Sequence, residues 1–83
     1  MKESEDIRSM TLEQADVEKQ YCIQQLLMGG NTQRRLEALG MIKGTSIIVL
    51  SKKKNGTLIY KMRGTRYAIG KGIASNIEVE EEV

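Results

Sequence analysis

The sequence predicts a mainly β fold with short helices: a small barrel of about five strands, with a short helix inserted after the first strand. Three observations lead to this class. Apolar residues recur in short runs, often at every second position; glycines interrupt these runs at short intervals; and the chain has only 83 residues. A chain of this size forms one domain and buries only about 60% of the surface that its unfolded form exposes. We expect residues 1–10 to be a flexible polar leader and residues 11–83 to form the domain.

The first strand is expected within QYCIQQLLM, residues 20–28. Tyr21 and Ile23 are predicted to face the core. The alternation of apolar and polar residues slips at the Gln-Gln pair 24–25, which indicates a bulge or a bend. Upstream, TLEQADVEKQ (11–20) is compatible with a short turn of helix that leads into the strand.

The segment NTQRRLEALGMIKGT, residues 31–45, predicts a short helix bracketed by glycines. Asn31 or Thr32 can cap its start by accepting hydrogen bonds from amides of the first turn. Leu36 and Leu39 are three residues apart, so both are expected to face the core.

The helix is expected to end at Gly40, because the residue after a helix often adopts a positive φ that glycine enters without a Cβ penalty. Met41 stands where an apolar residue commonly packs back on the last turn. Gly44 allows a second tight turn into the next strand. The residues assigned to structure are Leu36, Leu39, Gly40 and Gly44, together with Gly64 at a later turn.

A hairpin is expected next. SIIVLSKK (46–53) contains four consecutive aliphatic residues, which predicts burial on both faces of the strand. Asn55-Gly56 is a strong hairpin signal. The returning strand, TLIYKMRG (57–64), is expected to place Leu58, Tyr60 and Met62 on its inward face.

The chain then turns at Gly64-Thr65 into a short strand, RYAIG (66–70), and passes through at most one helical turn in KGIASN (71–76). IEVEEEV (77–83) has the alternation of apolar and polar residues that is typical of a final strand with one solvent-exposed face. Strands this short, with turns at such intervals, favour a highly curved barrel of the SH3-like type. The OB-fold is the alternative, although it usually has longer strands.

The charge of the chain is unevenly distributed along the sequence. The net charge is only +2, but residues 31–76 contain ten Lys or Arg against the single acidic residue Glu37, which gives +9. A basic surface can attract an acidic protein, a nucleic acid or an anionic membrane surface. The alternative is that solvent-facing sides of the strands are simply rich in lysine, because a patch requires clustering in space.

The composition argues against an enzyme or a metal carrier. The chain has no His, and Cys22 is its only cysteine, so the usual ligands of iron, zinc and copper are nearly absent. Cys22 lacks a His partner and is expected to be a small buried apolar residue. GKGIAS (70–75) lacks the spacing of a phosphate-binding loop, and the glutamates at 80–82 are expected to be solvated. We expect no enzymatic activity, no cofactor and no metal site.

The location is expected to be cytoplasmic. The first ten residues are polar and acidic, unlike a secretory signal. The longest aliphatic run, IIVL at 47–50, is far shorter than the roughly 20 residues that span a bilayer.

The order of these motifs resembles the FeoA family, ferrous iron transport protein A, over roughly residues 11–80. The family often has a glycine before the first strand, where this chain has DVEK. The residues that carry the resemblance are Arg35, Leu36, Leu39, Gly40, Met41, Gly44, Ile47, Val49, Met62, Gly64, Tyr67, Ala68, Ile69, Ala74, Ile77 and Val79.

The resemblance implies an SH3-like barrel related to the C-terminal domain of DtxR-type repressors. It also implies an accessory protein that acts on the cytoplasmic GTP-binding domain of FeoB, a membrane transporter of ferrous iron. The side chains expected to bind this partner are Arg34, Arg35, Met41, Lys43, Arg63 and Arg66.

Arginine suits this role because its planar fork can bind a carboxylate or phosphate with two hydrogen bonds. For Met41 the alternative is a core contact at the helix end. The alternative function is a small basic barrel that binds nucleic acid. Such sites usually add stacking aromatic residues, and Tyr60 and Tyr67 are the only aromatic residues of the basic stretch. We therefore expect no nucleic-acid partner.

Overall fold

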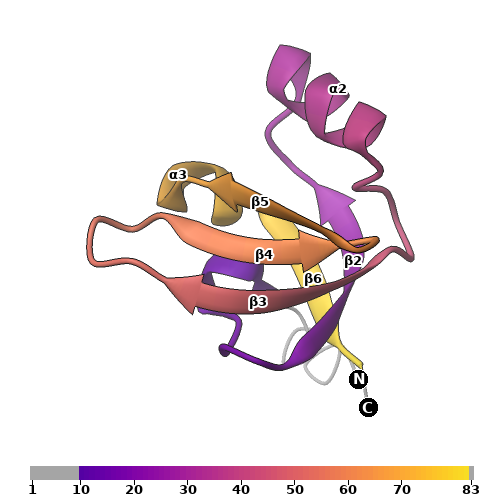
Figure 1. The fold of residues 1–83 in the computed structure, drawn as a ribbon. Coiled ribbons are helices and arrows are strands. Elements are labelled where there is room, and N and C mark those ends of the chain that lie inside the picture. The colour runs from indigo at the N-terminus through magenta and orange to yellow at the C-terminus, as the bar shows by residue number, and fades with distance from the viewer. Residues whose placement is uncertain (1–9, 83) are drawn as a thin grey trace, which may run out of the picture.

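The computed structural model describes residues 10–82. Six strands form one antiparallel sheet in the order β1-β6-β2-β3-β4-β5. In Figure 1, β3, β4 and β5 lie side by side and cross in front of β2 and β6. The elements in chain order are β1 (Met10–Thr11), η1 (Leu12–Gln14), β2 (Gln20–Leu26), α2 (Gly30–Leu39), β3 (Ser46–Lys52), β4 (Leu58–Met62), β5 (Thr65–Ile69), α3 (Lys71–Ala74) and β6 (Ile77–Glu81).

The mainly β class with short helices is confirmed, but the sheet has one strand more than predicted. The additional strand, β1, contains Met10 and Thr11, which pair with Val79 and Glu78 of β6. Its two residues have no alternation of their own, so the sequence alone does not reveal it. Met10 therefore belongs to the domain rather than to the leader, and the rest of the predicted leader lies outside the described residues.

The core forms on the inward faces of the strands. The predicted alternation is confirmed in β4, where every second side chain is buried, and in β6 for Ile77 and Val79. Complete burial of an aliphatic or aromatic side chain contributes about 1.5–3 kcal/mol. The fully buried large side chains are Tyr21, Tyr60, Leu12, Ile23, Met41, Ile47, Met62, Ile77, Val49 and Val79.

The prediction that β3 is buried on both faces is wrong. Ile47 and Val49 are buried, whereas Ile48 and Leu50 are only half-buried. The apolar run has one face on the core and the other face covered only in part. Four aliphatic residues in sequence therefore did not distinguish a strand buried on two sides from one with a sheltered outer face.

Two register shifts curve the sheet. One lies between Ile23 and Gln25 of β2, at the predicted bulge. A second lies between Val49 and Ser51 of β3, and the sequence did not predict it. Bulges increase the local twist of a strand, so both shifts help β3, β4 and β5 to fold across β2 and β6.

Helix α2 begins earlier than predicted. Its N-cap is Gly29, with φ 68°, and no side chain caps the helix. Instead of capping, Asn31 accepts a hydrogen bond from Nη1 of Arg34 at 2.8 Å. The Gly29 amide donates to Oε1 of Gln33 at 2.9 Å. The prediction of an Asn31 or Thr32 cap is therefore wrong, because the glycine turn already enters the helix.

The helix ends as the sequence predicts. Gly40 has φ 111° and ψ 4°, in the left-handed region. The amide of Gly40 donates to the Glu37 carbonyl at 2.9 Å, and that of Met41 donates to the Leu36 carbonyl at 3.0 Å. This pair of bonds satisfies carbonyls of the last turn and reverses the chain, so Met41 enters the core with no exposed surface.

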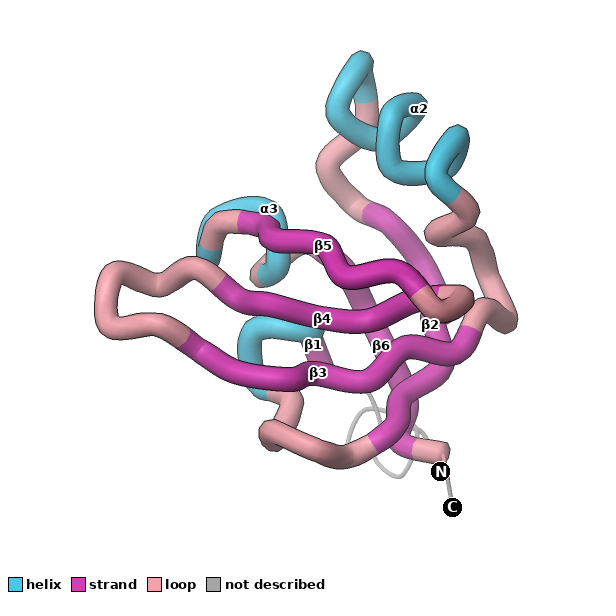
Figure 2. Tube along the Cα trace, viewed as in Figure 1, coloured by secondary structure: helices cyan, strands magenta, loops and turns pink. Residues whose placement is uncertain are grey.

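Leu39 does not face the core, contrary to the prediction. Leu36 is the only buried residue of α2, whereas Leu39 is 48% exposed. Figure 2 shows the reason: α2 stands at the end of two loops, away from the sheet. The chain reversal places Met41, rather than Leu39, in the core position beside Leu36.

We predict that Gly40→Ala destabilises the protein by about 1–2 kcal/mol, because the left-handed conformation is less favourable by this amount for a residue with a Cβ. Its Cβ would also lie 3.2 Å from Nη1 of Arg63, a flexible group that can move aside. The matched control is Gly72→Ala in α3, where φ is not positive and a Cβ meets no atom within 4 Å. Urea unfolding measures both, and equal stability of G40A and the wild type would contradict the assignment.

Candidate functional site

A groove lies between α2 on one side and β5 with α3 on the other. Its volume is about 320 Å³, which is within the range of ligand pockets, roughly 300–1,000 Å³. Helix α2 contributes Arg35, Leu36 and Leu39, and the opposite wall contains Tyr67 of β5 and Ile73 of α3. We call this feature the α2–β5 groove.

The wall of the α2–β5 groove is apolar and only partly covered. Leu39 is 48% exposed, and Tyr67 and Ile73 are half-buried against the core. Leu36, with 7% exposure, forms the deeper part. The exposed side chain of Leu39 is therefore part of a concave apolar surface that is formed by residues of α2, β5 and α3.

Two tyrosines line the groove on the side of the sheet. The rings of Tyr60 and Tyr67 are stacked, with centroids 5.4 Å apart and planes at 23°. Their residues are directly paired across β4 and β5, and such aromatic pairs stabilise a sheet by roughly 0.2–1 kcal/mol. Burial raises the pKa of the Tyr60 hydroxyl to about 12, and the adjacent Tyr67 adds to the rise.

The predicted partner-binding residues are not all at this groove. Arg35 lines it, whereas Arg34 lines a separate, shallow depression at the start of α2. Lys43 is exposed in the loop after the helix. Met41 is buried, so its assignment to the partner surface is wrong and the alternative, a core contact, is correct.

Arg63 does not line the groove, but it lies beside the C-terminal end of α2. It is the first residue of the turn between β4 and β5 and has φ 55°, an uncommon value for a residue with a Cβ. Its guanidinium lies against Gly40, at the C-terminal end of α2. A cation at this end of a helix is favoured by the helix dipole. Arg66, three residues later, is exposed on β5.

The sheet order separates the charges in space. Of the basic residues of the middle stretch, Lys52, Lys61 and Arg66 lie on β3, β4 and β5, and the acidic residues of the last strand lie on β6, beyond β2. The ion pairs among the described residues involve Lys19 and Lys71. Arg35, Arg63 and Arg66 therefore form no ion pair within residues 10–82.

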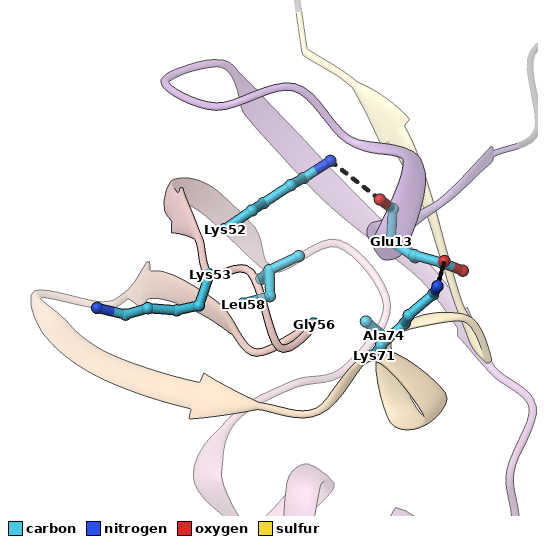
Figure 3. A pocket seen from close by; sticks show the side chains of 7 residues that line it. All are labelled: Glu13, Lys52, Lys53, Gly56, Leu58, Lys71 and Ala74. Atoms are coloured by element: carbon cyan, nitrogen blue, oxygen red, sulfur yellow. Dashed lines mark hydrogen bonds and ion pairs between the residues drawn. The ribbon is translucent and has the colours of Figure 1, made fainter.

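A second, smaller pocket lies at the β3–β4 hairpin (Figure 3). Its volume is about 180 Å³, below the range of ligand pockets. Nζ of Lys52 donates to the Glu13 carbonyl at 3.0 Å, and Nζ of Lys71 lies 3.7 Å from the Glu13 carboxylate. These contacts hold η1 against the hairpin and α3, while Lys53 points away from the pocket. The pocket is a junction of structural elements.

We next consider the side chains that could bind a metal ion or act as a nucleophile in the described part of the chain. Residues 10–82 hold no group of three or more His, Cys, Asp or Glu side chains that could hold a metal ion. Cys22 is half-buried rather than buried as predicted. Its Sγ accepts a weak hydrogen bond from Nε2 of Gln24 at 3.7 Å.

The sequence missed the residues of the opposite wall. Tyr67, Ala68 and Ile73 were not predicted to bind a partner, although all three line the groove. A usable signal exists in Tyr67, the only aromatic residue of the basic stretch outside the predicted core alternation. Ile73 gives no such signal, because one apolar residue in a single helical turn is ordinary.

This fold is a small SH3-like domain, and the comparisons with known proteins give its family. The FeoA domain family matches residues 10–81, so the chain belongs to the FeoA family. No curated protein sequence matches the chain. Within residues 10–82, no helix is long and apolar enough to cross a membrane.

Several solved structures share the fold. A crystal structure described as iron uptake regulatory protein (FeoA) is 28% identical, with a TM-score of 0.81, and the match covers 89% of this chain and 99% of that one. Stenotrophomonas maltophilia FeoA complexed with zinc, described as a prokaryotic SH3 domain protein, is 25% identical (TM-score 0.75; 86% and 89% covered).

The repressor-like relationship is also found. ScaR with bound Cd²⁺ is 24% identical with a TM-score of 0.77, over 86% of this chain but only 35% of ScaR. This likeness shows a shared fold in about a third of that protein. The expected relation to the repressor domain is therefore confirmed at the level of the fold.

We predict that Tyr60 ionises near pH 12, well after an exposed tyrosine with a pKa near 10.0. Because burial disfavours the anion, the stability that this shift contributes is complete below pH 10 and is lost as the pH rises through 12. An ultraviolet absorbance titration should show this late transition, and Tyr60→Phe should remove it. Ionisation of every tyrosine near pH 10 in the folded protein would contradict the burial of Tyr60.

Proposed function

We propose that this protein is a non-enzymatic cytoplasmic accessory factor of ferrous iron transport, which binds the cytoplasmic GTP-binding domain of a FeoB-type transporter. The observation that carries the proposal is the α2–β5 groove, an apolar concave surface beside arginines that have no ion-pair partner among residues 10–82. Membership of the FeoA family supports a role of this surface in iron transport.

The description of a similar protein also supports a role in ferrous iron transport. Stenotrophomonas maltophilia FeoA is described as a proposed bacterial ferrous iron transport activating factor. We extend that role to this chain as a proposal. In it, the transporter moves the iron, and this chain contributes a docking surface to the transporter.

The groove offers two kinds of contact to such a partner. Leu36 and Leu39 with Tyr67 and Ile73 accept apolar side chains. Arg35 at its edge can bind a carboxylate through two parallel hydrogen bonds. A small apolar centre surrounded by polar groups is the usual anatomy of a protein–protein interface.

A protein partner fits this surface better than a nucleic acid. Tyr60 is buried, and Tyr67 is half-buried and stacked on it. Neither ring is therefore fully open to a base, although single-stranded nucleic acid is bound largely by stacking on aromatic side chains. The basic residues that remain favour an acidic protein surface.

We predict that calorimetric titration with the cytoplasmic domain of the cognate FeoB-type transporter gives saturable binding. Leu39→Glu should weaken the affinity at least about tenfold, as expected for a buried apolar anchor. The matched control is Leu27→Glu: Leu27 is also 48% exposed but does not line the groove, so its change should leave the affinity nearly unaltered.

The experiment is run with GDP, with a non-hydrolysable GTP analogue and without nucleotide. Absence of binding in all three conditions would overturn the proposed function. Equal loss of affinity in L39E and L27E would place the docking surface away from the groove.

A further inference from the structure

We propose that the free edge of β5 binds an extended, acidic segment of the partner protein as an additional strand of the sheet, with its apolar side chains between β5 and α2. This inference rests on the proposed function and adds to it the mode of binding and the chemistry of the bound segment.

Strand β5 is the last strand of the sheet and pairs only with β4. The turn between them has two residues, Arg63 and Gly64, with φ 55° and 82°. A two-residue turn with positive φ at both positions is a type I′ hairpin, and the residues that flank it, Met62 and Thr65, form a hydrogen-bonded pair.

The hydrogen-bonded and non-hydrogen-bonded pairs alternate along an antiparallel ladder, and the β4–β5 register has no shift. The N–H and C=O groups of Arg66 and Ala68 therefore point away from β4. Both residues are exposed, and no backbone group elsewhere in residues 10–82 bonds to them. An edge of this kind is a template for another strand.

The α2–β5 groove lies along this open edge. Ala68 lines the groove, and Leu36 and Leu39 of α2 line the side across from β5. Figure 1 shows that β5 is the nearest to α2 of the three strands β3, β4 and β5. In a strand added there, alternate side chains point to opposite faces. One set enters the apolar groove and the other set faces the solvent.

The cross-strand pair Lys61–Arg66 indicates that the bound segment of the partner is acidic. These two exposed cations are directly opposite each other, in a non-hydrogen-bonded pair where side chains are closest. Like charges so placed destabilise a sheet, and no carboxylate of residues 10–82 forms an ion pair with either cation. An acidic residue of the added strand beside Arg66 relieves this repulsion.

The proposal predicts different effects of two substitutions at one position. Ala68→Pro removes an N–H that faces the open edge, without removing a bond to β4. Ala68→Thr keeps this N–H and suits a strand. In titrations with the transporter's cytoplasmic domain, A68P should bind at least about fivefold more weakly than A68T, because both add bulk at this position and only the proline lacks the N–H.

Amide hydrogen exchange of the wild-type chain provides a readout that requires no substitution. On addition of the transporter domain, the amides of Arg66 and Ala68 should become protected, while those of Tyr67 and Ile69, already bonded to β4, should change little. This readout also decides the matter if A68P does not fold, as judged by circular dichroism.

The outcomes separate the two proposals. Binding of the transporter domain without protection of Arg66 and Ala68, and with equal affinity for A68P and A68T, would overturn strand addition and leave the proposed function in place. Absence of binding by the wild type would overturn the proposed function, and strand addition with it.

Discussion

The left-handed backbone at Gly40 is the constraint on which the arrangement of α2 depends. It ends the helix, turns Met41 into the core, and leaves the Gly40 carbonyl to accept from Oγ1 of Thr45 at 2.9 Å. Leu36 is the only buried residue of α2, so no broad apolar face fixes the helix to the sheet. The position of α2 is therefore set mainly by its C-terminal reversal, with Arg63 packed over it.

A helix held at its end leaves space along its side, and this space is the α2–β5 groove. If α2 packed flat on β5, Leu39 would be buried and the outer backbone groups of β5 would be covered. The sheet order adds a second consequence, because β2 stands between the basic strands and the acidic strand β6. The apolar groove and the open edge therefore both lie in the basic part of the molecule, where an acidic partner is favoured.

Local rules of sequence predicted much of this fold. Glycine at the helix end, the alternation of Leu58, Tyr60 and Met62, and the bulge in β2 each follow from a few neighbouring residues. The sequence could not predict what depends on distant packing. Three features depend on how distant elements pack against one another: the exposure of Leu39, the half-burial of Cys22 and the two-residue strand β1. Local sequence patterns contain no information on this packing.

The central claim is that a partner protein docks between α2 and β5. It is tested most directly by intermolecular nuclear Overhauser effects between the methyl-labelled chain and the unlabelled cytoplasmic domain of the transporter. The account predicts contacts from the methyl groups of Leu36, Leu39 and Ile73. Contacts confined to Val17 and Leu27, which are exposed but lie outside the groove, would contradict it.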